Sequence, residues 1–546
     1  MIITFFFITV GLIFFFHPIS GFDIFLPYYK SIIKSSVITF CISAMIYLGA
    51  GKIKLSENLF NITKKKIYIC LILWIIFFTI CICILYRAFF YSAFDIAYFD
   101  NIYWNMFRGN FYYSTILGHS ALAHHFSPLM ILNGLIYKIL PLPIEGMFFI
   151  RSFFLALGGL AVYHICVEKK ITGLVSFIIV QLYFIYPVSA YYALDIFHPE
   201  DYIIVLILWS YLFVLKKKYI LSFFLLMVTM TAKEDAAITI ALFSLIYYFI
   251  SGKNKIYIFS FIAAIAYFVI VFYTVMPALR ESGFEQFWNI RYSGFGGSLA
   301  GIIKSTVLNP LSILKKMYSL ENIAYIALLM VPLFFLPLKS YKYILPFLPA
   351  LYLNLIADYS PQKQICNCYQ YAFLTVVWIC LIDSIAAMDN VRRMRISLAL
   401  LSSCILANYF WGPFPYARIF YMTKNNPYHT DAKFNRVTKL VTQIPESAFV
   451  CATEKTLPHL SHKKKIQWPG IELKYPESFQ KPIISYSKPD YYLLDLSEED
   501  SHHFSEENKF KYTELVHSVL ADTEYLVSGA EGQWLLLKKV IRYSRD

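Results

Sequence analysis

Residues 67–86 read IYICLILWIIFFTICICILY, a run of 20 residues without a single charged side chain. Three lysines, Lys64 to Lys66, precede the run and Arg87 follows it. About 20 predominantly apolar residues are needed for a helix to cross the hydrocarbon core of a bilayer. The stretch therefore predicts a transmembrane helix that begins directly after a basic cluster.

The rest of the chain repeats this pattern. Hydrophobic residues make up 58% of the 546 residues and charged residues 15%, against about 45–50% and about 25% in a soluble domain. We therefore predict an α-helical polytopic membrane protein with about 13 transmembrane helices, since runs near the required length recur that often. The predicted spans are roughly 3–20, 32–50, 67–89, 147–166, 172–192, 202–215, 219–231, 237–250, 256–277, 322–338, 343–357, 369–388 and 396–411.

Basic clusters between the spans predict the orientation. Lys and Arg are enriched in cytoplasmic loops, and one assignment places every cluster inside: N-terminus cytoplasmic, C-terminus outside. It requires residues 128–140 not to cross, which suits an apolar run of about 10–14 residues. The clusters are Lys52, Lys54 and Lys64 to Lys66; Lys169 and Lys170; Lys216 to Lys218; Lys253 and Lys255; Lys339 and Lys342; Arg392, Arg393 and Arg395.

This orientation divides the chain into two predicted domains. Residues 1–412 form the membrane domain, with a first outer-face loop over 91–146, and residues 413–546 have ordinary polarity. In the second part, SAFVCAT (447–453) and DYYLLDL (490–496) are typical of buried strands. A hairpin is expected around Ser528 to Glu531. We expect a small extracytoplasmic α/β domain.

Several functional classes are excluded by the sequence. The formal charge of +14 lies in short clusters between apolar runs and not in one stripe, so nucleic acid is not an expected partner. The phosphate-binding Walker pattern and the GxGxxG motif are both absent, so no nucleotide cofactor is expected. The lipid bilayer is the expected partner of the membrane domain.

The first outer loop contains two aspartates, Asp95 and Asp100, on a segment expected to lie at the membrane interface. Carboxylates this close to a bilayer are costly and usually have a partner or a function, and a carboxylate can act as the general base for an acceptor hydroxyl. Helix capping by Asp95 is the structural alternative.

His119, His124 and His125 follow in the same loop. Imidazole and carboxylate are common metal ligands, so a divalent metal is an open option, although the spacing matches no strong metal motif. Contact with substrate through His124 and His125 is the favoured interpretation.

Two further motifs lie at predicted outer ends of spans. In FHPED, His198 and Glu200 are candidate substrate-contact residues, and a place in the first turn of a helix is the structural alternative for Glu200. In TAKED, Lys233, Glu234 and Asp235 separate two short apolar segments, where charges pair with one another or line a water-filled site. Lys233 could bind an anionic phosphate; a purely structural ion pair is the alternative.

A resemblance adds to these interpretations. The motifs FDIAYFDNIYW (94–104), HHFSPLM (124–130), IFHPE (196–200), TAKEDAA (231–237), RYSGFGGS (291–298), ILPFLPALYLNLI (344–356), LPHLS (457–461) and YYLLDL (491–496) occur in one order. Together they resemble a family of predicted prokaryotic membrane proteins of unknown function, the domain of unknown function 2079, which is related to the GT-C glycosyltransferases.

The resemblance implies a GT-C-like fold that transfers a sugar from a polyprenyl-phosphate donor at the outer membrane face. It implies that Asp95 or Asp100 is the catalytic acid residue and that Lys233 and Arg291 face the lipid phosphate. The family tends to have His-Tyr at the start of a late span, where this chain has Gln370-Tyr371. An acid/base role at that position is therefore in doubt, and Tyr371 is retained as a contact residue.

The mechanism expected from these residues is inverting transfer to an envelope acceptor, which could be a glycan, a lipid or a protein. An Asp general base removes the acceptor proton while the lipid phosphate leaves. Two alternatives are a transporter or flippase of lipid-linked glycans and a non-catalytic envelope assembly protein.

Overall fold

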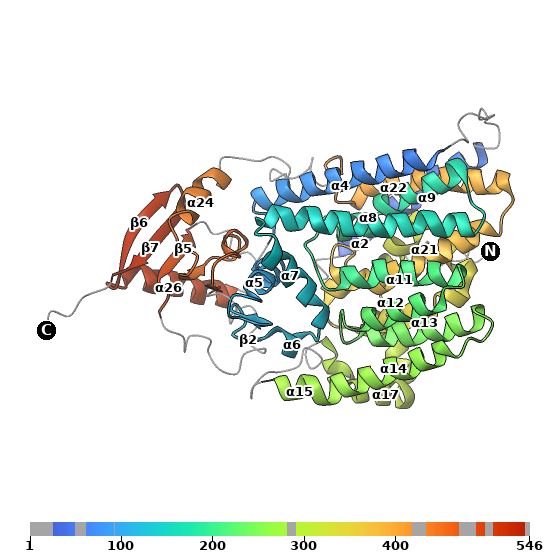
Figure 1. The fold of residues 1–546 in the computed structure, drawn as a ribbon. Coiled ribbons are helices and arrows are strands. Elements are labelled where there is room, and N and C mark those ends of the chain that lie inside the picture. Colours follow the sequence, from blue (N-terminus) through green and yellow to red (C-terminus); the bar gives the residue numbers. More distant parts are fainter. Residues whose placement is uncertain are drawn as a thin grey trace.

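A computed structural model describes residues 26–49, 62–91, 93–280, 291–417, 433–468, 488–496 and 506–540. The predicted first span at 3–20 lies outside these ranges. Long helices form one body of the molecule, and a β-sheet built from the C-terminal part of the chain lies at one end of it (Figure 1). The first loop, with α5, α6 and α7, lies between the two (Figure 1).

Six helical segments of the described residues are long and apolar enough to cross a membrane, or up to eight if each of two bent helix pairs is one span. The protein is therefore a multi-pass membrane protein. Four of the six segments lie in single helices: Ser31–Gly49 within α2 (Leu26–Gly49), α4 (Lys64–Arg87), α8 (Ile144–Glu168) and α22 (Asn390–Trp411). The fifth, Ile256–Leu279, is made of α14 (Ile256–Ile270), η4 (Val271–Val275) and α15 (Met276–Leu279). The sixth, Cys368–Ala386, is made of η10 (Cys368–Gln370) and α21 (Tyr371–Ala386).

The predicted number of thirteen spans is not confirmed. Three of the expected spans form helices of only 16, 12 and 15 residues: α11 (Glu200–Leu215), α12 (Tyr219–Met230) and α13 (Ala236–Ile250). A helix rises about 1.5 Å per residue, so these helices are shorter than the ~30 Å hydrocarbon core. The polar turn TAKED separates α12 from α13, whereas Glu200 and Asp201 of FHPED form the first turn of α11.

Two other expected spans are broken. The pair α9 (Gly173–Ile185) and α10 (Pro187–Ala193) bends by 58°, and Leu320–Leu333 bends by 98° against Leu336–Tyr343. Phe334 and Phe335 form the second break, with φ of 53° and 54°, a left-handed conformation that is uncommon for bulky residues. The elements here are α19 (Leu320–Met330), η6 (Val331–Leu333), η7 (Leu336–Tyr343), η8 (Leu345–Phe347), α20 (Leu348–Ile356) and η9 (Ser360–Lys363).

Close helix packing in the core depends on glycine. A Cβ atom at Gly158 of α8 would lie 2.2 Å from the Tyr183 hydroxyl, and one at Gly159 would lie 2.6 Å from the ring of Phe184. Small residues let helix backbones approach closely within membranes. The two glycines thus set the distance between α8 and α9.

The first loop is made of short elements. They are η2 (Ala93–Ala97), α5 (Tyr98–Asn105), β1 (Tyr113–Ser114), β2 (His119–Ser120), α6 (Ala121–His124), η3 (Pro128–Met130) and α7 (Ile131–Ile139). The second polar loop contains η5 (Ser293–Phe295), α17 (Leu299–Leu308) and α18 (Pro310–Met317). The apolar run at 128–140 forms a helix too short to span, as expected.

The C-terminal sheet has five strands in the order β4-β3-β5-β7-β6. β3 pairs in parallel with β4 and with β5 (Val450 opposite Tyr491), and β7 pairs antiparallel with β5 and with β6. The elements are α24 (Lys433–Val441), β3 (Phe449–Ala452), η11 (Leu457–Leu460), β4 (Lys465–Gln467), β5 (Tyr491–Asp495), α26 (Glu506–Ala521), β6 (Tyr525–Glu531) and β7 (Trp534–Lys539).

Both predicted strands are present, but the hairpin turn lies later than expected. Ser528 to Glu531 belong to β6, and the chain reverses at Gly532, whose φ is +64°. Glycine adopts this left-handed conformation without strain. The predicted domain boundary at residue 412/413 stays a prediction, since residues 418–432 lie outside the described ranges.

Candidate active site

The two aspartates of the first loop have opposite surroundings. Asp95 lies in the π-helical turn η2 and is exposed, whereas Asp100 on α5 is buried with 6% of its surface accessible. A proton acceptor must be within reach of its substrate. Of the two carboxylates, Asp95 is the one that solvent can reach.

Both oxygens of the Asp100 carboxylate are already engaged. The Tyr137 hydroxyl donates to Oδ1 at 2.5 Å, and the Ser461 hydroxyl donates to Oδ2 at 2.5 Å. The Nε2 atom of His462 lies 3.1 Å from Oδ2. Asp100 therefore joins the first loop to η11 and the residues that follow it.

Neighbouring side chains extend this contact. The Asn101 side-chain amide donates to the carbonyls of Ser461 (2.7 Å) and Lys463 (2.9 Å). The Thr115 hydroxyl bonds the Ile466 backbone, accepting from its N–H at 3.1 Å. Residues 461–466 are thus held against the first loop by hydrogen bonds between neutral groups and by hydrogen bonds to the Asp100 carboxylate.

Buried His198 and partly exposed Asp195 form a pair in the turn before α11. Their closest atoms, Nε2 and Oδ2, lie 3.3 Å apart. Burial lowers the pKa of His198, but the Asp195 carboxylate outweighs that effect and raises the pKa to about 9. Asp95 acts on His198 in the same direction, so the exposed carboxylate lies in electrostatic range of a protonated imidazole.

Lys233, from the turn between α12 and α13, reaches Glu200 on α11. Lys233 Nζ donates to Glu200 Oε1 at 2.6 Å, and both side chains are buried. The ring of Tyr371 lies 5.5 Å from Nζ, and the Tyr371 hydroxyl is hydrogen-bonded to Asp235. Four of the predicted site residues thus form one buried cluster.

Glu234 points to the first loop. Its Oε1 lies 2.9 Å from His125 Nδ1, and its Oε2 accepts from the Phe126 backbone N–H at 2.9 Å. The His124 ring lies 4.4 Å from that of His125. Burial lowers the pKa of His124 well below its usual range, so His124 is a neutral side chain at physiological pH.

Arg291 is partly exposed and lies between two aromatic rings. Its guanidinium carbon is 4.8 Å from the ring centre of Tyr359 and 5.3 Å from that of Tyr369, and Nη2 donates to the Tyr369 hydroxyl at 3.1 Å. Burial raises the pKa of Tyr359. The positive charge of Arg291 opposes this rise, and the negative charge of Asp95 adds to it. The Asp95 carboxylate and the Arg291 guanidinium therefore both lie in electrostatic range of Tyr359.

The described part of the chain shows no metal centre. Within the described ranges, no group of three or more His, Cys, Asp or Glu side chains is arranged to hold a metal ion. His124 and His125 lie side by side, but the Nδ1 atom of His125 faces Glu234.

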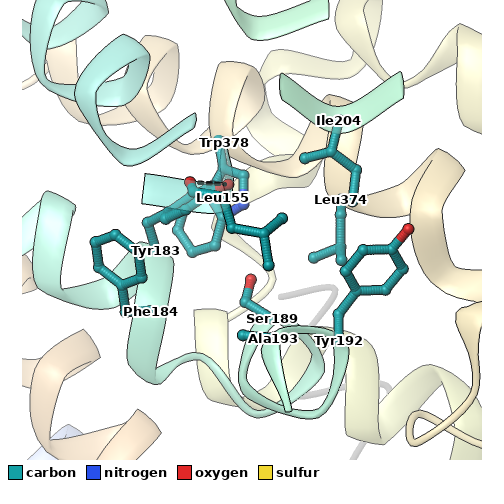
Figure 2. A pocket seen from close by; sticks show the side chains of 9 residues that line it. All are labelled: Leu155, Tyr183, Phe184, Ser189, Tyr192, Ala193, Ile204, Leu374 and Trp378. Atoms are coloured by element: carbon teal, nitrogen blue, oxygen red, sulfur yellow. Dashed lines mark hydrogen bonds between the residues drawn. The ribbon is translucent and has the colours of Figure 1, made fainter. Parts of the chain in front are cut away.

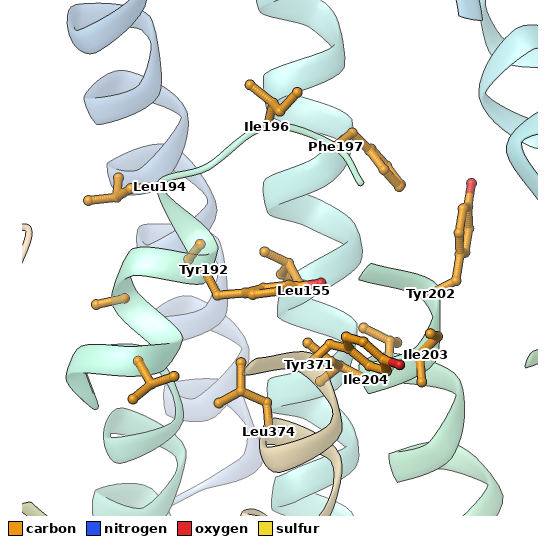
Figure 3. Close-up of a cluster of buried hydrophobic side chains, with 14 of the residues drawn as sticks. Leu155, Tyr192, Leu194, Ile196, Phe197, Tyr202, Ile203, Ile204, Tyr371 and Leu374 are labelled. Atoms are coloured by element: carbon orange, nitrogen blue, oxygen red, sulfur yellow. The ribbon is translucent and has the colours of Figure 1, made fainter. Parts of the chain in front are cut away.

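Apolar side chains close the inner side of the cluster. A small cavity behind the turn at Tyr192 and Ala193 is lined mainly by apolar groups such as Leu155 and Trp378 (Figure 2). Tyr371 lies beside Ile204 and Leu374 in the buried core (Figure 3). Apolar side chains thus surround Tyr371 on this side of the cluster.

Residues 85–523 match the family described as "Predicted membrane protein (DUF2079)". The chain belongs to this family. All of the site residues described above lie within the matched range. The expected relation to the family is therefore confirmed, whereas the roles of its individual residues stay predictions.

This DUF2079 chain was also compared with curated proteins and with solved structures. No curated protein matches it. Crystal structures of ArnT from Cupriavidus metallidurans are similar in fold, one bound to undecaprenyl phosphate (8% identity, TM-score 0.46) and one in the apo state (9% identity, TM-score 0.38). Each likeness covers 86% of this chain and 98% of ArnT.

One important residue of the DUF2079 site was not predicted from the sequence. Arg151, fully buried on α8, donates from Nε to Asp201 Oδ2 at 2.8 Å and from Nη1 to the carbonyls of Ala193 (2.8 Å) and Asp195 (2.6 Å). It therefore holds the turn that carries His198. An ionisable residue inside an apolar run is itself a signal of function, and Arg151 could have been found from it.

Proposed function

We propose that the protein transfers a sugar from a polyprenyl-phosphate donor to an acceptor hydroxyl at the outer membrane face, with Asp95 as general base. The observation that carries this proposal is the arrangement of Asp95 and Arg291 around Tyr359. It combines an exposed carboxylate with a partly exposed guanidinium at the end of the membrane domain that the lysine clusters predict to be the outer one. A hydroxyl acceptor needs the first group, and a phosphate needs the second.

In the proposed reaction, Asp95 takes the proton of the acceptor hydroxyl while that oxygen attacks the anomeric carbon. The bond from the anomeric carbon to the phosphate oxygen breaks, the configuration inverts, and polyprenyl phosphate leaves with its negative charge facing Arg291. A fixed cation at the developing charge lowers the barrier because it needs no reorganisation. The acceptor is an envelope glycan, lipid or protein.

The buried cluster has a supporting role in this proposal. Lys233 is already paired with Glu200 at 2.6 Å, so it contributes to the potential around a bound phosphate without contacting it. His198, Glu234 and Asp235 fix the turns on which the cluster is built, as do His124 and His125 in the first loop. Tyr371 positions Asp235 through its hydroxyl.

The test is a transfer assay with purified protein in lipid nanodiscs and a panel of polyprenyl-phosphate sugars. Asp95→Asn should lower turnover about 10²–10⁴-fold, the usual contribution of a general base, without lowering the melting temperature. Asp100→Asn should lower the melting temperature, because a buried carboxylate with hydrogen bonds from Tyr137 and Ser461 is lost.

Glu145→Gln is the matched control, since Glu145 is a partly exposed acid at the start of α8, 3.8 Å from Arg87 and outside the cluster. It should leave transfer unchanged. Full activity of the Asp95→Asn protein, or no transfer by the wild type from any donor in the panel, would refute the proposal.

Transport of a lipid-linked glycan is a second candidate, and the two broken spans favour it. Transporters commonly bind their substrates at discontinuous helices, and Leu320–Leu333 and Leu336–Tyr343 meet at 98°. Proteoliposomes with a lipid-linked glycan distinguish the two functions. Translocation without any sugar transfer would establish transport in place of catalysis.

A further inference from the structure

Helices α17 and α18 are joined by Asn309 alone and contact each other, and residues 299–317 are called the hairpin below. The Ser298 hydroxyl caps α17 by accepting from the Gly301 N–H at 3.0 Å. Pro310 occupies the first turn of α18, where its missing N–H costs nothing. Each helix is therefore well defined at its N-terminus, and the tip between them is short.

One face of the hairpin is anchored to the protein. Ile302 and Ile313 are buried at 2% and 4% exposure in a small core with Ile356 of α20. The hydroxyls of Thr306 and Tyr352 lie 2.5 Å apart. The hairpin thus has a fixed position on α20, which determines the direction of its opposite face.

The opposite face and the tip are apolar and accessible. Val307, Leu308 and Leu311 at the tip are 71%, 70% and 76% exposed, and Ile303 and Leu314, further from the tip, are 57% and 59% exposed. Contiguous apolar surface of this kind marks an interaction site. Exposure is thus greatest at the tip and decreases on both sides of it.

Exposed lysines flank this apolar tip. Lys304 on α17 and Lys315 on α18 lie further from the turn than the three most exposed residues. An apolar tip with basic residues behind it is the pattern of a segment that enters a membrane while its ammonium groups stay near lipid phosphates. Figure 1 places α17 at the level of the helical body, away from the C-terminal sheet.

We propose that the 299–317 hairpin inserts its tip into the outer leaflet of the bilayer. Amphipathic helices of this type lie about 5–10 Å into the boundary between headgroups and acyl chains. The hairpin is therefore a lipid-binding element in the segment between η5 and α19. This inference concerns the lipid surface alone and is independent of the proposed sugar transfer.

The base of the hairpin connects to Arg291. Lys316 Nζ lies 2.5 Å from Asp358 Oδ1, and the Asp358 N–H donates to the Arg291 carbonyl at 2.8 Å. Insertion of the tip therefore sets the height of Arg291 relative to the membrane surface, close to the level of lipid phosphates.

Depth-dependent fluorescence quenching tests the proposal. A bimane label is attached to Leu311→Cys in nanodiscs of phosphatidylcholine and phosphatidylglycerol, in a background with Cys41→Ser and Cys366→Ser, since these are the exposed cysteines. A lipid with a nitroxide on its acyl chain should quench this label several-fold more strongly than aqueous iodide does. Val307→Cys is the second site, used if Leu311→Cys does not fold.

Leu526→Cys is the matched control, because Leu526 on β6 is a similarly exposed apolar residue (63%) on the C-terminal sheet. Its label should be quenched by iodide and not by the lipid nitroxide. The proposal is overturned if the Leu311 label behaves like the Leu526 label. It is equally overturned if neither quencher reaches it, since a second copy or another protein then covers the tip.

Discussion

Among the carboxylates near His198, that of Asp195, 3.3 Å away, contributes most to keeping the imidazole protonated. Because the folded-state pKa of about 9 exceeds the ordinary value of about 6.5, the protonated pair stabilises the fold fully below about pH 6.5. This contribution decreases as the pH rises and is lost above about pH 9. The wild-type melting temperature should therefore fall over this range.

The His198→Gln variant should lack the stabilisation that the protonated imidazole provides. Its melting temperature should therefore vary less than that of the wild type between about pH 6.5 and about pH 9. The measurement is thermal unfolding in nanodiscs followed by intrinsic fluorescence. His517→Gln, at an exposed position on α26, should keep the wild-type pH dependence. Parallel curves for wild type and His198→Gln would contradict the prediction.

At the scale of elements, the ion pair of Arg151 and Asp201 joins α8 to the start of α11. Both side chains have no exposed surface. Arg151→Met should destabilise the protein by about 3–5 kcal/mol, because Asp201 is left buried and unpaired. Arg151→Met combined with Asp201→Leu should recover part of that loss, since no uncompensated charge remains.

Thermal unfolding again provides the measurement for these variants. Lys216→Met is the control, because Lys216 and Glu168 form a half-exposed pair at 3.7 Å and such pairs contribute little. An unchanged melting temperature for Arg151→Met would show that the buried pair does not hold the turn.

The positions of the helices could largely be predicted from the sequence, but the breaks within two of the expected spans could not. A run such as 67–86 is enough to predict a spanning helix, because a span is identified by its length and its apolar composition alone. The break at Phe334 and Phe335 depends on tertiary packing, including the contact of Phe334 with Phe40 at 5.2 Å between ring centres. No local pattern reveals such a contact.

The candidate site, too, could be predicted from the sequence only in part. The Lys233–Glu200 cluster follows from the cost of isolated charges near a bilayer, so its members could be predicted from residue type and position. The difference between Asp95 and Asp100 could not, because Ser461 and His462 determine it from across the sequence. Contacts between segments so far apart leave no trace in spacing or periodicity.

At the scale of the whole molecule, the orientation in the membrane stays a prediction. A cysteine at Leu526 should react with a membrane-impermeant thiol reagent in intact cells, and one at Lys217 should react only after permeabilisation. Both positions are exposed, so accessibility to the reagent depends on the side of the membrane. The background carries Cys366→Ser. The reverse pattern would invert the topology derived from the lysine clusters.

The contact between Asp100 and Ser461 has a consequence for how the protein is made. The two residues are 361 positions apart in the chain, and a ribosome adds about 5–20 residues per second. The first loop therefore leaves the insertion machinery some 20–70 s before its partner segment exists. During that time its Asn and Asp side chains lack their final hydrogen bonds. The loop thus forms its contacts with residues 461–463 only after the last membrane helix has been inserted. In a truncated chain that lacks these residues, we expect quality-control proteases to recognise the first loop.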